Sequence, residues 1–365
     1  MRKMLFIFYY PNGGVETLAR QRNLALKPFA IHFDYLYLMK GPGLQNIHDG
    51  SHVYITSNND EMKQIITDGG YEAIIICSDY QKLETIREFG YSGVLIYEVQ
   101  GLGNLIDTEY WLSNLSKPYI DQHADAILAP LTPHLQDFLK QYYPDKPKYH
   151  FHNGLDIHQF KPNDQLRVDE NPIVAWVGRI EANKNWKEFI EVSKRLTFTH
   201  SSLQFWMFLD GIQYEEKEME EFRLLLKDDP FFEKITLYYD IPHAEMPNYY
   251  STIAKSNGFL CSTSINEGFG YALLEAMSTG CPVLTSNSDG ITSFVFHNHT
   301  GKMYKQGNID EAVVQAKDIL DNTLLREQLI ENAINHVHSY FSLEQYGRNF
   351  IQMIEELKNN QSELH

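Results

Sequence analysis

The sequence predicts an α/β protein with two doubly wound parallel sheets, one in each half of the chain. Short apolar runs alternate with helix-like segments in the first half, and this alternation restarts after a loop at 153–172. A chain of 365 residues is also too long for one ordinary core and suits two domains of roughly 150–190 residues. We therefore expect domains at 1–160 and 161–340, followed by a helix within 341–365.

The first half contains five predicted strands separated by helix-like segments. These strands are Leu5–Tyr9, His52–Thr56, Ala73–Cys77, Val94–Tyr97 and Ala126–Ala129. The first run follows a basic start at Arg2 and Lys3, so a signal peptide is an alternative interpretation. Because this run is short, has no small-residue cleavage site and leads into a glycine turn, we interpret it as a buried strand.

The second half repeats the pattern and ends in helices. Its predicted strands are Ile173–Val177, Gln204–Leu209, Ile235–Tyr239, Gly258–Cys261 and Val283–Thr285. Helical spacing of apolar residues predicts three closing helices, at Ile309–Ile319, Leu324–His338 and Leu343–Lys358.

Composition excludes several classes of protein. The net charge of −17 argues against nucleic acid or an anionic membrane as a broad electrostatic partner. No apolar run approaches the roughly 20 residues needed to span a bilayer. Cys77, Cys261 and Cys281 lack metal-ligand spacing, and the 15 histidines form no metal-binding pattern. We expect a cytoplasmic protein with reduced thiols in its core and no bound metal.

Two carboxylates, Glu267 and Glu275, lie eight residues apart across a glycine-marked turn. The apolar run Phe259–Cys261 predicts a strand, so the residues after it form a loop at the carboxyl end of the sheet, where open α/β sheets bind ligands. A helix is predicted at Tyr271–Thr279, with Gly280 just past its end. The amides just before this helix would then favour phosphate; they belong to Gly268, Phe269 and Gly270.

This stretch resembles the donor motif of the retaining family 4 glycosyltransferases, which have the GT-B fold. Other landmarks of that family follow in the same order along the chain. They are Gly13–Glu16 after the first strand, Asn153–Asp156 with Phe160 and Pro162, and Val177–Arg179 with Lys184. The resemblance covers the chain from about residue 5 to residue 305.

The resemblance implies a GT-B architecture, with two Rossmann-like domains facing across a cleft and a C-terminal helix that crosses back to the first domain. It also implies retaining transfer of a hexose or N-acetylhexosamine from a nucleotide sugar, most simply a UDP-sugar, without a metal or other cofactor. The donor would bind the second domain and a hydroxyl acceptor the first. The acceptor could be a cell-envelope polymer, a polysaccharide, a lipid-linked sugar or a small metabolite, so attachment to the inner face of the membrane stays open, as does the oligomeric state.

The resemblance also assigns roles to individual residues. Arg179 and Lys184 would offset the charge that grows on the departing diphosphate. Glu267 would lie beside the donor sugar, and Glu275 would accept hydrogen bonds from the ribose hydroxyls. Further donor contacts are expected at Gly13, Gly14, Asp240, Ile241, Gly268, Phe269, Gly270 and Tyr271. The alternative is that these residues have no part in binding. Arg179 and Lys184 would then be a solvated pair of cations and Glu267 an ordinary loop carboxylate, and Glu275 would be favoured by the dipole of the first helical turn.

One position departs from the family. Many relatives carry a histidine after the fourth strand of the first domain, where this chain has Glu98. Glu98 could act as a base or orient the acceptor, or it could be an ordinary strand-end residue. This departure leaves room for a catalytically silent nucleotide-sugar-binding or scaffold protein. A sugar-nucleotide epimerase with the same fold is a further alternative.

Overall fold

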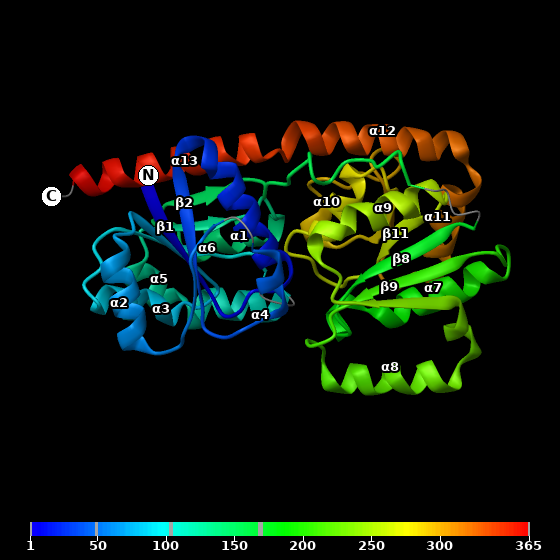
Figure 1. The fold of residues 1–365 in the computed structure, drawn as a ribbon, viewed down its shortest axis with the longest axis horizontal. Coiled ribbons are helices and arrows are strands. Elements are labelled where there is room, and N and C mark those ends of the chain that lie inside the picture. The colour runs from blue at the N-terminus through cyan, green and yellow to red at the C-terminus, as the bar shows by residue number, and fades with distance from the viewer. Residues whose placement is uncertain (1, 48–49, 102–104, 167–170, 364–365) are drawn as a thin grey trace. The chain divides into compact units, whose positions relative to one another are not determined.

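The computed structural model describes residues 2–47, 50–101, 105–166 and 171–363 (Figure 1). The chain divides into two compact units. Unit 1 comprises Met1–Gly154 and Phe341–His365, and unit 2 comprises Leu155–Tyr340. The divisions fall at 154/155 and 340/341, beside the 160/161 and 340/341 boundaries expected from the sequence.

Unit 1 is built on a parallel sheet of seven strands, in the order β3-β2-β1-β4-β5-β6-β7. The strands are β1 Arg2–Phe8, β2 Ile31–Tyr37, β3 Val53–Ile55, β4 Ala73–Cys77, β5 Val94–Glu98, β6 Ala126–Ala129 and β7 Lys148–His150. Every residue of β4 is buried, as expected for a central strand whose sheet is covered on both faces. The strand order reverses between β1 and β4, so this sheet is doubly wound as predicted.

Helices connect the strands of unit 1. They are α1 Gly13–Leu26, α2 Asn59–Gly69, α3 Gln81–Glu88, α4 Leu105–Tyr110, α5 Lys117–His123 and α6 Pro133–Tyr142. α2 begins where the Asn58 side chain accepts hydrogen bonds from the amides of Asp60 and Glu61. The C-terminal helix α13, Leu343–Glu363, is drawn in red in Figure 1 and packs against α1 within the same unit.

Unit 2 has a parallel sheet of six strands, in the order β10-β9-β8-β11-β12-β13. The strands are β8 Ile173–Gly178, β9 Gln204–Leu209, β10 Ile235–Tyr239, β11 Phe259–Ser262, β12 Val283–Ser286 and β13 Lys302–Tyr304. The helices are α7 Trp186–Thr197, α8 Glu216–Asp228, α9 Met246–Lys255, α10 Tyr271–Ser278, α11 Ile309–Asp321 and α12 Thr323–Tyr340. The order reverses between β8 and β11, and open α/β sheets bind ligands outside the strand ends at such a point.

The structure confirms the predicted α/β class and adds three strands that the sequence did not indicate, β2, β7 and β13. Two of these, β7 and β13, have only three residues each, and β2 carries the buried Asp34. Among the described residues, no helix combines the length and the apolar character needed to cross a membrane.

Candidate active site

The loop after β8 carries the two predicted phosphate-binding cations. Arg179 follows the last residue of β8 directly, and Lys184 ends a single 3-10 turn at Ala182–Lys184. Asn185 then adopts a left-handed conformation, with φ of 51°, and the chain enters α7. The Asn185 side-chain amide donates a hydrogen bond of 2.7 Å to Glu188, which holds this sharp turn in place.

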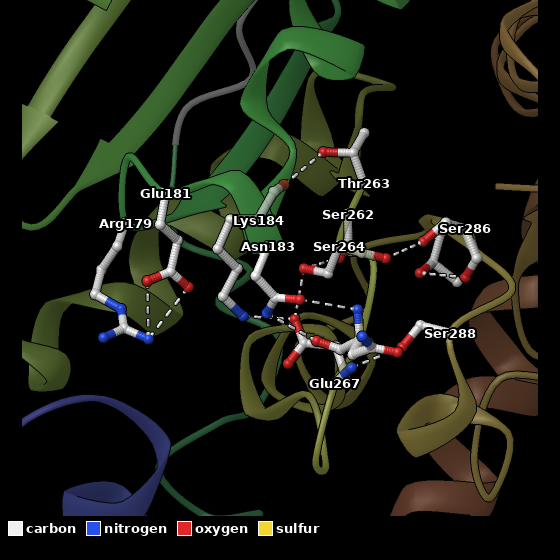
Figure 2. Close-up of polar contacts among 12 residues, drawn as sticks. Arg179, Glu181, Asn183, Lys184, Ser262, Thr263, Ser264, Glu267, Ser286 and Ser288 are labelled. Carbon is white, nitrogen blue, oxygen red and sulfur yellow. Dashed lines mark hydrogen bonds and ion pairs between the residues drawn. The ribbon is translucent and has the colours of Figure 1, made fainter. Parts of the chain in front are cut away.

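Asn183 joins this loop to the loop that follows β11. Its carbonyl oxygen accepts from the amide of Ile265 at 2.8 Å, and its side-chain oxygen accepts from the amide of Asn266 at 3.1 Å. The Asn183 side-chain nitrogen donates back to the Asn266 carbonyl at 3.1 Å. Figure 2 labels Asn183 beside Lys184 of the first loop and Glu267 of the second. No sequence motif indicated that Asn183 connects the two loops.

Glu267 lies within the second loop and contacts Lys184 directly. Its Oε1 accepts hydrogen bonds from Lys184 Nζ and Ser264 Oγ, both at 2.6 Å (Figure 2). Its backbone amide donates to Ser288 Oγ at 2.9 Å. The Glu267 and Lys184 side chains are 15% and 21% exposed, so solvent reaches the pair. The structure therefore brings together a cation and a carboxylate that are 83 residues apart in sequence.

Gly290 lies directly against the backbone of Glu267. A Cβ atom at position 290 would lie 2.0 Å from the Glu267 carbonyl oxygen, which is closer than atoms can approach. Only glycine fits there without a shift of the loop. No sequence motif marks Gly290, because its close approach to Glu267 exists only in the folded unit.

Arg179 forms an ion pair with Glu181. Its Nη2 lies 3.2 Å from both carboxylate oxygens, as Figure 2 shows. Arg179 is 42% exposed, whereas the Glu181 side chain is only 13% exposed. Burial raises the pKa of Glu181, and the charges of Arg179 and Lys184 oppose this shift. Glu181 was not among the site residues predicted from the sequence.

Glu275 lies on α10, in its second turn rather than in the first turn considered above. The helix begins after Gly270, which has a left-handed φ of 87°. Glu275 Oε1 lies 2.7 Å from His243 Nε2, and Oε2 accepts from the Tyr250 hydroxyl at 3.2 Å. Both partners belong to the segment between β10 and β11, and no sequence motif marked them. They hold a nearly buried carboxylate, which is 5% exposed, in one orientation.

The Gly-Phe-Gly segment before α10 is anchored by aromatic packing. Phe269 is buried, and its ring centroid lies 5.0 Å from that of Tyr271 and 5.6 Å from that of Phe294. The side chains of Phe269 and Tyr271, which were predicted to contact the donor, therefore position the loop through packing. Asp240, with φ of 50°, accepts a hydrogen bond from the Gly211 amide and joins the loops after β9 and β10; Ile241 follows it.

In unit 1, Gly13 and Gly14 form the start of α1, where Asn12 Oδ1 accepts from the Gly13 amide at 2.7 Å. Gly13 has a φ of 59°, and the position of its absent side chain is open space. This open start of α1 lies after β1, next to the point where the strand order reverses.

Glu98 does not present an accessible carboxylate. Its side chain is 0% exposed and forms an ion pair with Arg22, which is equally buried. Gln100 Nε2 also donates to Glu98 Oε1 at 2.8 Å. This burial favours the strand-end alternative that the sequence left open, and the catalytic role of Glu98 stays a prediction.

The described residues contain no cluster of three or more His, Cys, Asp or Glu side chains suited to hold a metal ion. The three cysteines are free and buried, and burial raises their pKa values, that of Cys281 to about 12.

Residues 158–336, which lie within unit 2, match the family described as Glycosyl transferases group 1. This region is therefore similar to the group 1 glycosyl transferase domains. The four charged residues of the candidate site all lie inside it: Arg179, Lys184, Glu267 and Glu275.

Curated relatives share this region at low identity. The chain is 25% identical over 198 residues to the capsular polysaccharide biosynthesis glycosyltransferase CapM of Staphylococcus aureus, covering 52% of this chain and 49% of CapM. It is 30% identical over 156 residues to 2-deoxystreptamine N-acetyl-D-glucosaminyltransferase of Niallia circulans, covering 43% and 38%. The chain thus spans about half the length of the curated relatives that it matches.

Among solved structures, HepE of Anabaena in complex with UDP and glucose aligns with a TM-score of 0.81 and 17% identity. The alignment covers 98% of this chain and 100% of that chain. This similarity shows the GT-B fold, as the sequence resemblance predicted.

Proposed function

We propose that this chain is a glycosyltransferase that moves a sugar from a nucleotide sugar to a hydroxyl group. The observation that carries the proposal is the Lys184–Glu267 contact at 2.6 Å, built from two loops at the point where the strand order of unit 2 reverses. A solvated surface pair would not need the Asn183 and Ser264 contacts that fix both of its loops. Similarity to the group 1 domain family supports the same function.

Each charged residue has a task in this reaction. The bond between the anomeric carbon and the diphosphate oxygen breaks, and negative charge grows on the leaving group. Arg179 and Lys184 would stabilise this charge, which is the role that a metal ion fills in other transferases. Glu267 would face the positive charge that develops on the sugar. Glu275, held by His243 and Tyr250, keeps acceptor capacity for ribose hydroxyls.

The finer assignment is a retaining, metal-independent transfer of a hexose or N-acetylhexosamine from a UDP-linked donor. In this reaction the departing diphosphate would take the proton of the acceptor hydroxyl. The choice of UDP is supported by HepE, whose structures contain UDP or UDP-glucose. For the acceptor we propose a growing polysaccharide or another cell-envelope glycan, since CapM is described as a capsular polysaccharide glycosyltransferase.

The proposal is tested by release of free nucleotide from a panel of UDP-, GDP- and ADP-sugars in the presence of EDTA. Wild type is compared with Glu267→Gln, Arg179→Ala and Lys184→Ala. Lys227→Ala serves as the matched control, because it removes one exposed cation from α8 in the same unit. We expect turnover of one donor class, lost in the three site variants and kept in the control.

Other results would point elsewhere. Nucleotide binding without turnover, even with a panel of sugar acceptors, would identify a silent binding protein. Turnover that EDTA abolishes would contradict the metal-independent mechanism. A wild-type protein that neither binds nor hydrolyses any nucleotide sugar would overturn the proposal.

A further inference from the structure

The proposed diphosphate site contains more negative than positive charge. The charged groups with the largest effect on the pKa of Glu181 are the positive Arg179 and Lys184 and the negative Glu215 and Glu267. With Glu181 itself, three carboxylates face two cations. An incoming diphosphate would add further negative charge, so its binding is favoured when a carboxylate gives up its cation or takes up a proton.

The individual contacts show which carboxylate this is. Glu267 has an assigned place beside the sugar and is held by Ser264 as well as by Lys184. Glu215 accepts from the Ala182 amide at 3.1 Å, so it serves to hold the loop. Glu181 has no task in the proposed reaction, yet both of its oxygens face the Arg179 Nη2 that a diphosphate would use.

We propose that Glu181 occupies Arg179 in the nucleotide-free protein and competes with the diphosphate for it, which weakens the binding of the nucleoside diphosphate product. This inference rests on the proposed function and names a residue that sets nucleotide affinity. Glu181 and Arg179 are two positions apart on one short loop, so the carboxylate stays beside the arginine after the exchange. There it repels the bound diphosphate and favours its release.

The energetics allow such an exchange. Arg179 is 42% exposed, so the ion pair is screened by solvent and is weak, as exposed pairs generally are. The Glu181 carboxylate is less accessible, and burial already raises its pKa. When phosphate oxygens take Arg179, Glu181 loses its favourable neighbour and binds a proton more readily. This protonation of Glu181 should strengthen nucleotide binding by the wild type, relative to Glu181→Gln, as the pH falls.

The test measures the dissociation constant of UDP by titration calorimetry, for wild type and for Glu181→Gln. We expect UDP to bind roughly three- to tenfold more tightly to Glu181→Gln. The gain should shrink when the same change is made in an Arg179→Gln background, because the competition for Arg179 is then absent and only the direct repulsion of the diphosphate remains. Glu191→Gln is the matched control, since it removes the carboxylate of the Arg195–Glu191 pair on α7.

The pH profile separates this role from a purely structural one. UDP titrates in the same range, so the informative quantity is the difference between wild type and Glu181→Gln, which should grow with rising pH. Thermal unfolding checks that the variant is folded, and Glu181→Ala repeats the test if it is not. Unchanged or weaker UDP binding in folded variants overturns this inference alone. A wild type that binds none of UDP, GDP and ADP overturns it together with the proposed function.

Discussion

The two units place an ion pair near the carboxyl end of a parallel strand, but in very different surroundings. In unit 2, Lys184 and Glu267 are 21% and 15% exposed. In unit 1, Arg22 and Glu98 are both 0% exposed. Phosphate can replace a carboxylate only where it can reach the cation, so the first pair can exchange partners and the second cannot. The burial of a charge pair therefore decides whether it can serve binding or only stability.

The pairs also hold different parts of the fold together. The Arg22 guanidinium lies 5.4 Å from the ring centre of Phe350, and its Nε donates to the Tyr346 hydroxyl at 2.8 Å. Both aromatic residues belong to α13, so the buried pair ties the C-terminal helix to α1 and β5. The Lys184–Glu267 pair instead joins two loops at the candidate site.

The largest effect is expected for Glu98→Ala. This change leaves the Arg22 charge buried without its partner, and breaking a buried pair typically costs roughly 3–5 kcal/mol of unfolding free energy. Urea denaturation measures the loss. Glu344→Ala, which breaks an exposed pair with Arg348 on α13, should cost less than about 0.5 kcal/mol. Equal losses for the two variants would contradict the distinction between the units.

Glu267→Gln should lower donor turnover roughly 10²- to 10³-fold, because the neutral amide no longer faces the positive charge on the sugar. The pair is partly exposed, so the melting temperature should change little. Initial rates of nucleotide release and a thermal melt measure the two quantities. A large loss of stability would mean that this pair is structural, like the Arg22–Glu98 pair.

Gly290→Ala should disturb the candidate site through the backbone of Glu267. The new Cβ would collide with the Glu267 carbonyl oxygen, so the loop must shift, at a cost of about 1–3 kcal/mol. Turnover should fall together with stability, in contrast to Glu267→Gln. Gly307→Ala is a useful comparison, since the Cβ at that position would meet open space and only the positive φ adds strain. Full activity in Gly290→Ala would show that this loop geometry is not required.

Glu275→Gln should weaken UDP binding about tenfold, since hydrogen bonds to a charged acceptor contribute roughly 1.5–3 kcal/mol. The loss should depend on the ligand. UDP that lacks both ribose hydroxyls should bind wild type and variant alike. A variant that loses affinity equally for both ligands would show that Glu275 acts on the fold and not on the ribose.

The smallest effect is expected for the stability of Glu181→Gln. Because burial raises the pKa of Glu181, the folded chain binds the proton more tightly than the unfolded chain does. The wild type therefore loses stability as the pH rises from the unfolded pKa through the folded pKa. The glutamine variant lacks this loss and should be more stable at neutral pH, by less than about 1 kcal/mol. Thermal melts at a series of pH values from roughly 4 to roughly 8 measure the difference, because the Glu181 carboxyl group is expected to titrate within that range.

Much of the fold could be predicted from the sequence, because many of its strands are short runs rich in apolar residues. β4, β6, β9 and β10 were predicted with the bounds that the structure shows. The missed strands lack this signal: β13 contains the buried Lys302, whose charge is met by Asp318. Such a lysine looks exposed until its partner on another element is known.

The sequence by itself determined the α/β class, the position of the two loops and the residue types at the candidate site. Those properties depend on local patterns of apolar residues, glycines and charges. Only the tertiary structure decided the partners of each charge. It pairs Lys184 with Glu267, Arg179 with Glu181 and Arg22 with Glu98. Of these three pairs, only the last has no access to solvent. Contacts and burial arise between segments far apart in the chain, so no local pattern could have revealed them.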